Sequence, residues 1–257
     1  MRADRYCAAH YGSRTKAAEA IGRGEVTVNG RAVEKPSEEI SDGDAVEFRA
    51  AGPRFVSNGG YKLDRALEAF GTDVRGLVFA DIGASTGGFT DCLLQRGARR
   101  VYCVDVGESQ LAETLREDPR VVRMDGRNAR YLTAGDFPET VDGIAVDVSF
   151  ISLEIILPVL CGIVRGGGTV LALIKPQFEC GSRKALSKGG IVKDARQRGR
   201  IVGNIYDLCA ANGLCPQDLV NAPLRERKNV EYIILLEKGG SARMTREEAV
   251  GKAEHLV

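Results

Sequence analysis

The stretch Leu77–Phe89, which reads LVFADIGASTGGF, decides the fold class of this chain. Its first four residues are apolar, an acid follows at Asp81, and three glycines come before a helical pattern that runs from Phe89 to Arg96. This order is typical of a buried strand that passes through a tight turn into the helix covering it. Because glycine lets the backbone approach a ligand closely, the turn is also a candidate binding site.

The alternation of strand and helix patterns continues on both sides of this stretch. We predict further strands at 101–104, 121–122, 144–146, 169–174, 215–220 and 230–236, and further helices at 63–70, 109–116, 152–163 and 194–211. Such alternation indicates an α/β fold, a doubly wound and mostly parallel sheet with helices on both faces. We place this domain at residues 58–240 and expect a polar C-terminal tail at 241–257.

Residues 1–50 follow a different pattern and predict a small α+β domain. Ser13 is placed to cap a short helix, and Asn29-Gly30 between β-branched residues is a strong hairpin signal. Residues 51–57 contain a Gly-Pro pair at the point where the patterns change. We interpret them as a linker between the two domains.

Charge gives the chain no overall basic excess, since 36 Lys and Arg residues balance 35 Asp and Glu residues and the net charge is +1. Binding to nucleic acid would therefore depend on local patches. The first domain offers one, because its basic residues precede its acidic ones along the chain. The candidates for contacts with phosphate are Arg5, Arg14, Lys16, Arg23 and Arg31. A solvated face without a partner explains the same charges, and charge alone favours that simpler interpretation.

The composition indicates the cellular compartment and excludes some kinds of metal site and membrane association. Seven cysteines without any CxxC spacing, and only two histidines, exclude a zinc knuckle and give no basis for a metal site. We interpret the cysteines as small buried hydrophobic residues in a reducing compartment, and we therefore expect a cytoplasmic protein. The longest apolar stretch, 151–164, is interrupted by Glu154 and Pro158 and is too short to span a bilayer. We therefore expect no stable membrane association.

The residues around the glycine turn favour one class of ligand. Ser85 stands where the dinucleotide motif GxGxxG has its second glycine, so that motif is absent. A carboxylate at Asp81 would repel a pyrophosphate but suits an amine, and Asp105, at the end of the next strand, suits ribose hydroxyls. We favour S-adenosylmethionine over NAD as the ligand, with a purely structural turn as the third interpretation.

Four charged residues are candidates for a catalytic set. Asp147 and Lys175 end the fourth and fifth predicted strands. Lys62 opens the helix before the first strand, and Glu231 starts the last strand. An isolated charge at the end of an apolar run is costly unless it is paired or functional. Taken alone, each residue is explained by a solvated strand end or a structural ion pair. Two lysines and two acids at one edge of a sheet together point to catalysis.

Five motifs in fixed order, GGYKL, DIGASTGGFT, DVSFISL, LIKPQFE and NVEY, resemble the TlyA family, whose members are described as haemolysins and as rRNA 2′-O-methyltransferases. The C-terminal part is also similar to FtsJ-type RNA methyltransferases, and residues 1–50 are similar to the S-four-type RNA-binding domain. The resemblance implies a Rossmann-like methyltransferase sheet, S-adenosyl-L-methionine as cofactor, and rRNA or ribosomal subunits as partners. It leaves the oligomeric state, the ribosomal subunit and the target nucleotide open.

The resemblance also implies roles for individual residues. The catalytic set is Lys62, Asp147, Lys175 and Glu231, and the cofactor contacts are Asp81, Gly83, Ser85, Gly87, Asp105 and, beside the adenine, Asn128. The implied reaction moves a methyl group from the sulfonium to a ribose 2′-oxygen, and Lys175 either accepts the hydroxyl proton or only orients the hydroxyl. A basic stretch after Lys175 offers further RNA contacts through Arg183, Lys184 and Lys188.

Three other functions are compatible with parts of the sequence. An NAD-dependent oxidoreductase would leave Asp81 and the lysines unexplained. The haemolysin name suggests a pore-forming cytolysin, but we see no membrane-length or strongly amphipathic apolar segment that would support this function. A non-catalytic RNA-binding protein would not need four charged residues at strand ends.

Overall fold

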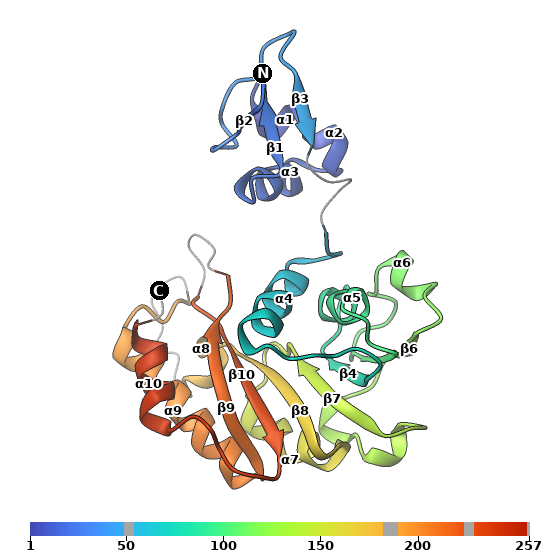
Figure 1. Cartoon of the computed structure of the whole chain (residues 1–257), viewed down its shortest axis with the longest axis vertical. Coiled ribbons are helices and arrows are strands. Elements are labelled where there is room, and N and C mark those ends of the chain that lie inside the picture. Colours follow the sequence, from blue (N-terminus) through green and yellow to red (C-terminus); the bar gives the residue numbers. More distant parts are fainter. Residues whose placement is uncertain (49–53, 182–189, 224–228, 256–257) are drawn as a thin grey trace. The chain divides into compact units, whose positions relative to one another are not determined.

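A computed structural model describes residues 1–48, 54–181, 190–223 and 229–255 of the chain (Figure 1). The chain divides into two compact units, Met1–Arg54 and Phe55–Val257. We call them the first and the second unit and describe each by itself.

The first unit combines three short helices with a three-stranded antiparallel sheet in the order β2-β1-β3. Its elements are α1 (Ala3–Tyr6), α2 (Ala8–Tyr11), α3 (Arg14–Gly22), β1 (Val26–Val28), β2 (Arg31–Ala32) and β3 (Val46–Phe48). Ser13 caps α3, because its Oγ accepts a hydrogen bond from the backbone N–H of Lys16 at 3.2 Å. Asn29 and Gly30 have φ values of 50° and 77° and form the tight turn between β1 and β2, as the Asn-Gly signal predicts.

The second unit is built on a seven-stranded sheet in the order β6-β5-β4-β7-β8-β10-β9. Its strands are β4 (Val78–Ile82), β5 (Arg100–Val104), β6 (Val121–Met124), β7 (Val141–Val146), β8 (Val164–Ile174), β9 (Leu214–Asn221) and β10 (Tyr232–Lys238). The strands β4 to β8 are parallel, and β10 lies antiparallel between β8 and β9. This sheet confirms the predicted doubly wound, mostly parallel α/β fold.

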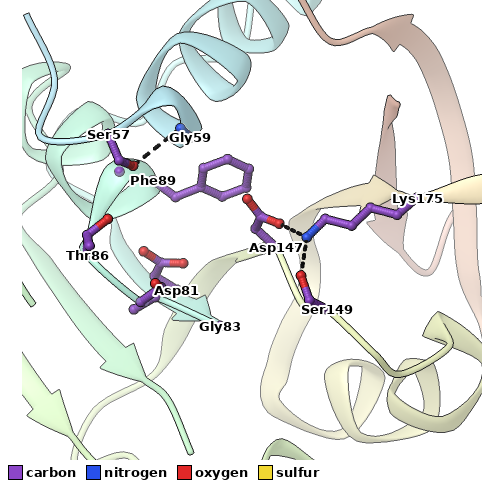
Figure 2. A pocket seen from close by; sticks show the side chains of 12 residues that line it. Ser57, Gly59, Asp81, Gly83, Thr86, Phe89, Asp147, Ser149 and Lys175 are labelled. Carbon is purple, nitrogen blue, oxygen red and sulfur yellow. Dashed lines mark hydrogen bonds and ion pairs between the residues drawn. The ribbon is translucent and has the colours of Figure 1, made fainter. Parts of the chain in front are cut away.

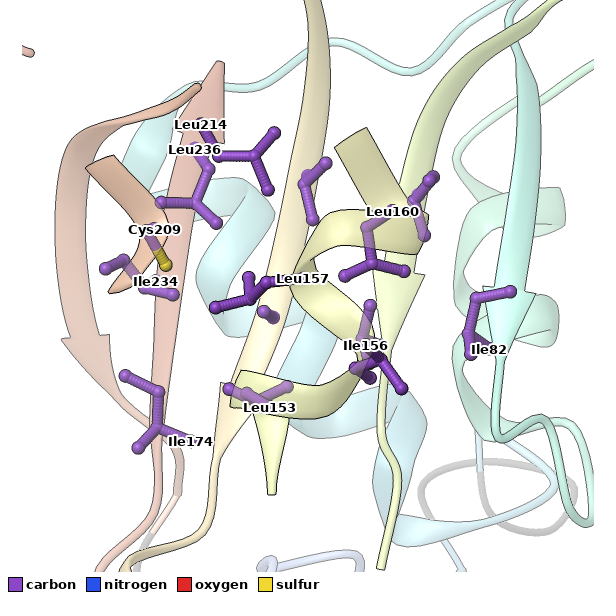
Figure 3. Packing of buried hydrophobic residues seen from close by; sticks show 14 of the residues in the cluster. Ile82, Leu153, Ile156, Leu157, Leu160, Ile174, Cys209, Leu214, Ile234 and Leu236 are labelled. Carbon is purple, nitrogen blue, oxygen red and sulfur yellow. The ribbon is translucent and has the colours of Figure 1, made fainter. Parts of the chain in front are cut away.

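Helices cover both faces of this sheet. They are α4 (Asn58–Phe70), α5 (Gly88–Gln95), α6 (Glu113–Arg116), α7 (Leu153–Ile163), α8 (Pro176–Glu179), α9 (Ala195–Ala211) and α10 (Arg246–His255), with short 3-10 turns at Ala129–Tyr131 and Ala134–Asp136. One buried cluster joins Ile82 of β4 to the apolar face of α7 (Figure 3), and another joins Phe79 to α4 and α5. Side chains of β4 thus enter the two cores alternately, Phe79 one and Ala80 and Ile82 the other, because successive residues of a strand point to opposite faces.

The structure differs from the sequence-based expectations in the bounds of several elements; α4, for example, begins at Asn58 and not at Lys62. The helix expected at 109–116 is reduced to α6, because Ser109 has a φ of 54° and Ala112 is extended. Residues 55–57, which we placed in the linker, belong to the second unit, where Phe55 is fully buried. The expected polar tail contains α10, which buries Ala249 and Ala253.

Candidate active site

The four residues of the predicted catalytic set all lie near one edge of the sheet in the second unit. Asp147 follows β7 and Lys175 follows the neighbouring parallel strand β8. Glu231 directly precedes β10, whose start lies at this same edge because β10 runs antiparallel to β8. Tyr232 is opposite Ile174, so continuing that register by one residue places Glu231 opposite Lys175.

Lys175 and Asp147 form a close ion pair, with 2.5 Å between the Lys175 Nζ and the Asp147 Oδ1 (Figure 2). The same Nζ donates a hydrogen bond to the Ser149 Oγ at 2.7 Å. Lys175 is 8% exposed, so its amine is held in place by one ion pair and one hydrogen bond. Ser149 was not among the predicted site residues.

Lys62 and Glu231 form the second ion pair. The Lys62 Nζ on α4 donates to the Glu231 Oε2 at 2.6 Å, and each side chain is 18% exposed. The predicted set of two lysines and two acids is therefore present as two ion pairs, each made of one lysine and one acid.

The glycine turn after β4 requires backbone conformations that other residues rarely adopt. Gly83 has a φ of 86°, and a Cβ added there would lie 2.7 Å from the carbonyl oxygen of Asp147. Gly87 has a φ of 92°, and an added Cβ would collide with Leu115. Ser85 also has a positive φ, 48°, and its N–H donates to the Asp105 Oδ2 at 2.8 Å. The turn thus lies directly against both Asp147 and Asp105.

A cavity of about 190 Å³ lies between this turn and the Lys175–Asp147 pair (Figure 2). Asp81 lines it and is fully buried. The Asp81 Oδ2 accepts hydrogen bonds from the Thr90 N–H at 2.9 Å and the Thr90 hydroxyl at 2.7 Å, whereas its Oδ1 has no partner among the described residues. Burial raises the pKa of Asp81 to about 7, and the nearby Asp147 adds to the shift. A buried acid with one unused oxygen is a suitable partner for a ligand cation.

The beginnings of two helices contribute to the same cavity. Ser57 and Gly59 come from the start of α4, and Gly88 is the first residue of α5. An added Cβ at Gly88 would lie 2.1 Å from the Ser57 Oγ, so the two helix starts pack closely together. Helix N-termini favour negative charge, so this wall suits a carboxylate. Ser57 was missed because it precedes the expected helix and was assigned to the linker.

A larger cavity of about 520 Å³ adjoins the first one and shares the wall formed by Gly83, Ser85, Asp147 and Ser149. The predicted cofactor residues Asp105 and Asn128 line it. The Asp105 Oδ1 accepts a hydrogen bond from the Gly107 N–H at 2.8 Å, and the Asn128 Oδ1 accepts one from the Arg130 N–H at 3.1 Å.

Phe150 is a second residue of this cavity that sequence reasoning missed. It is 90% exposed, has a φ of 65°, and its ring lies 5.1 Å from that of Phe178. A positive φ is unusual for a bulky residue and marks a conformation that its surroundings impose. One feature of the sequence could have identified it, because Phe150 and Phe178 follow the candidate residues Asp147 and Lys175 by three positions each.

The basic residues predicted to contact RNA fall into three groups. Three are engaged in ion pairs, Arg14 with Asp4 at 2.9 Å, Arg23 with Glu25 at 2.6 Å and Arg31 with Glu38 at 2.7 Å. Arg5 and Lys16 are exposed and form no ion pair within the part of the chain that the structure describes. Arg183, Lys184 and Lys188 lie outside the described residues.

Across the described residues, no helix has the length and apolar character needed to cross a membrane.

Comparisons with known proteins show similarity in both units. A family model described as FtsJ-like methyltransferase matches residues 55–238, and one described as S4 domain matches residues 1–46. The chain is 46% identical to the 16S/23S rRNA (cytidine-2′-O)-methyltransferase TlyA of Mycobacterium tuberculosis, over 87% of this chain and 84% of the relative. It is 39% identical to Hemolysin A of Brachyspira hyodysenteriae, over 91% of this chain and 98% of the relative.

A solved structure also resembles this protein over most of its length. It is described as a hemolysin from Streptococcus thermophilus, with a TM-score of 0.74 and 37% identity, over 98% of this chain and 95% of the other. The match of the methyltransferase model to well over half of the sequence is decisive, and the chain belongs to the FtsJ-like methyltransferase family.

Proposed function

We propose that this protein is an S-adenosyl-L-methionine-dependent rRNA ribose 2′-O-methyltransferase of TlyA type. The observation that carries the proposal is that the Lys175–Asp147 pair borders the shared wall of the two cavities. A methyl donor held across that wall would have its reacting centre beside Lys175. The 46% identical TlyA relative, whose name gives rRNA cytidine 2′-O-methylation, supports the same reaction class.

The residues of both cavities fit this cofactor. The unpartnered Oδ1 of Asp81 suits the ammonium group of the methionyl part, and the starts of α4 and α5 suit its carboxylate. Asp105 retains lone pairs for the two ribose hydroxyls, and Asn128 would lie beside the adenine. When bound, the cofactor supplies a methyl group on a sulfonium, which is an electrophile that needs no further activation.

The remaining work falls to the side chains of this chain. The 2′-hydroxyl must be brought in line with the methyl group and must lose its proton. Lys175 either accepts that proton or orients the hydroxyl, and its contacts with Asp147 and Ser149 hold the amine in position for both roles. The Lys62–Glu231 pair would border the neighbouring part of the substrate site.

RNA binding would use two kinds of group. Arg5 and Lys16 of the first unit are exposed and pair with no acid among the residues that the structure describes, so they are available to phosphates. The exposed ring of Phe150 offers a stacking surface for a base at the cavity mouth. The partner would be rRNA or a ribosomal subunit, and from this we infer a cytoplasmic location.

Transfer of labelled methyl groups from S-adenosylmethionine to rRNA, free and within isolated ribosomal subunits, tests the proposal. We expect transfer by the parent protein, mapped to ribose 2′-oxygens. Lys175→Ala should lower the rate about 10²- to 10⁴-fold. Lys252→Ala, a lysine that lines neither cavity, should leave the rate unchanged. Activity of Lys175→Ala close to that of the parent would remove Lys175 from the mechanism.

The names of two relatives favour a second candidate function, direct haemolysis. Release of dye from liposomes measures it without RNA. Lysis by the parent protein, retained in Lys175→Ala, would support a membrane activity separate from methyl transfer. A parent protein that binds rRNA but transfers no methyl group would instead support a non-catalytic RNA-binding role.

A further inference from the structure

A single carboxylate joins the segment after β7 to the segment after β8. Glu179, the last residue of α8, lies four positions beyond Lys175. Its Oε2 accepts a hydrogen bond from the Ser152 hydroxyl at 2.6 Å, and its Oε1 accepts one from the Leu153 N–H at 3.0 Å. Both oxygens of one side chain are therefore bound to the other segment.

Among the described residues, the contacts of this carboxylate are the two hydrogen bonds from Ser152 and Leu153. Burial raises the pKa of Glu179, so placing the charge there carries a cost. The hydrogen bonds from Ser152 and Leu153 are the interactions that offset this cost. A partly buried acid whose two oxygens both bind a neighbouring segment points to a requirement for a defined geometry at that place.

The bridged segment carries the groups that meet Lys175. Asp147 and Ser149 hold the Lys175 amine at its beginning, and Ser152 binds Glu179 at its end. Phe150 lies between them with a φ of 65°, a conformation that persists only when its surroundings impose it. The segment is thus held at both ends to the chain that follows β8, by the Lys175 amine at its beginning and by the Glu179 carboxylate at its end.

We propose that Glu179 is a positioning residue for methyl transfer, which holds the segment 147–152 against Lys175 through Ser152 and Leu153. This inference rests on the proposed function. Glu179 lines neither cavity, so it acts through Asp147 and Ser149 and not by touching the substrate. A displacement of about 1 Å in a reacting group can lower a rate about 10²-fold, so such a bridge can matter for the chemical step.

Three variants separate positioning from general damage. Glu179→Ala removes both acceptors. Glu179→Gln keeps an oxygen for the Leu153 N–H and gains an N–H₂ group that can donate to the Ser152 hydroxyl, so it should rescue the bridge. Glu154→Ala removes an exposed acid at the start of α7 and is the matched control.

The first readout is the single-turnover rate of methyl transfer at saturating rRNA and cofactor. We expect a 10- to 100-fold lower rate for Glu179→Ala, a rate within about threefold of the parent for Glu179→Gln, and no change for Glu154→Ala. Cofactor affinity measured by calorimetry should change less than threefold, because the proposed contacts to the ammonium group and the ribose, Asp81 in β4 and Asp105 directly after β5, lie outside the segment 147–152. A Glu179→Ala rate within twofold of the parent, or a loss explained by weaker cofactor binding, would overturn the inference.

Hydrogen–deuterium exchange tests the bridge without RNA. Peptides covering 147–155 should exchange faster in Glu179→Ala than in the parent and in Glu179→Gln, because the Leu153 N–H loses its acceptor. Unchanged exchange there would overturn the inference even if the parent is an active methyltransferase. A parent without methyl transfer would instead contradict the proposed function, so the two failures are distinguishable.

Discussion

The Lys62 Nζ lies 2.6 Å from the Glu231 Oε2, which links the first helix of the second unit to its last strand beside the strand end that carries Lys175. Both side chains are largely withdrawn from water, so losing one partner leaves a poorly solvated charge. This pair therefore affects both the stability of the fold and the shape of the candidate site.

We expect Lys62→Met and Glu231→Gln each to lower the free energy of unfolding by about 1–3 kcal/mol and to slow methyl transfer. The double exchange Lys62→Glu with Glu231→Lys should recover much of the stability but not the rate, because the amine and the carboxylate then occupy the wrong elements. Urea unfolding and methyl-transfer assays measure the two effects. Recovery of the rate by the exchange would show that pairing alone is required.

Binding of S-adenosylmethionine should depend on pH through Asp81. Its pKa is about 7 in the ligand-free protein because of burial, and a ligand ammonium favours the carboxylate form. Below pH 7 binding must therefore release a proton, so the affinity falls as the pH is lowered. Between pH 7.5 and pH 6 we expect the dissociation constant to rise about 5- to 10-fold. Calorimetry in buffers of different ionisation enthalpy should detect the released proton, and Asp81→Asn should bind weakly without this pH dependence.

Replacing Gly83 with alanine should disturb the cofactor site as well as the backbone. Its φ of 86° disfavours any side chain, and the new Cβ would lie 2.7 Å from the Asp147 carbonyl. Gly76→Ala is the matched control, because Gly76 has a φ of 73° but no atom within 4 Å of an added Cβ. Urea unfolding should show a loss of about 1–2 kcal/mol for Gly76→Ala and a larger one for Gly83→Ala. Only Gly83→Ala should weaken cofactor binding; equal effects would argue against close packing of the turn on Asp147.

The first unit should bind RNA mainly through its unpaired cations. Arg5→Ala and Lys16→Ala should weaken binding of rRNA by the full chain and reduce the slope of log affinity against log salt by about 1 each. Arg23→Ala and Arg31→Ala should have smaller effects, because each arginine already pairs with an acid. Filter binding at several salt concentrations measures both. A flat salt response would favour a solvated face without a partner.

Phe150→Ala should weaken RNA binding with little effect on folding, because its ring is 90% exposed. Loss of base stacking would cost about 1–3 kcal/mol, visible as a higher KM for rRNA. Phe150→Trp should retain most of the affinity. Ile155→Ala, a 48% exposed apolar residue of α7 outside both cavities, is the control and should behave like the parent.

The sequence by itself determined the fold class, because the signals for it are local. Apolar runs, the glycine turn at 83–88 and the Asn29-Gly30 hairpin depend only on neighbouring residues. It also determined that Asp147 and Lys175 share an edge, since parallel strands of one sheet end on the same side. The motifs added the family resemblance and the candidate residues.

Only the tertiary structure decided which groups meet. It pairs Lys175 with Asp147 and Lys62 with Glu231, and it places β10 antiparallel between β8 and β9. It also pairs Arg14, Arg23 and Arg31 with acids and holds Phe150 at a positive φ. The physical reason is that strand direction and the Lys62–Glu231 and Lys175–Asp147 pairs depend on residues far apart in the chain. Even the local pairs of Arg23 and Arg31 depend on side-chain conformation, which periodicity and spacing do not record.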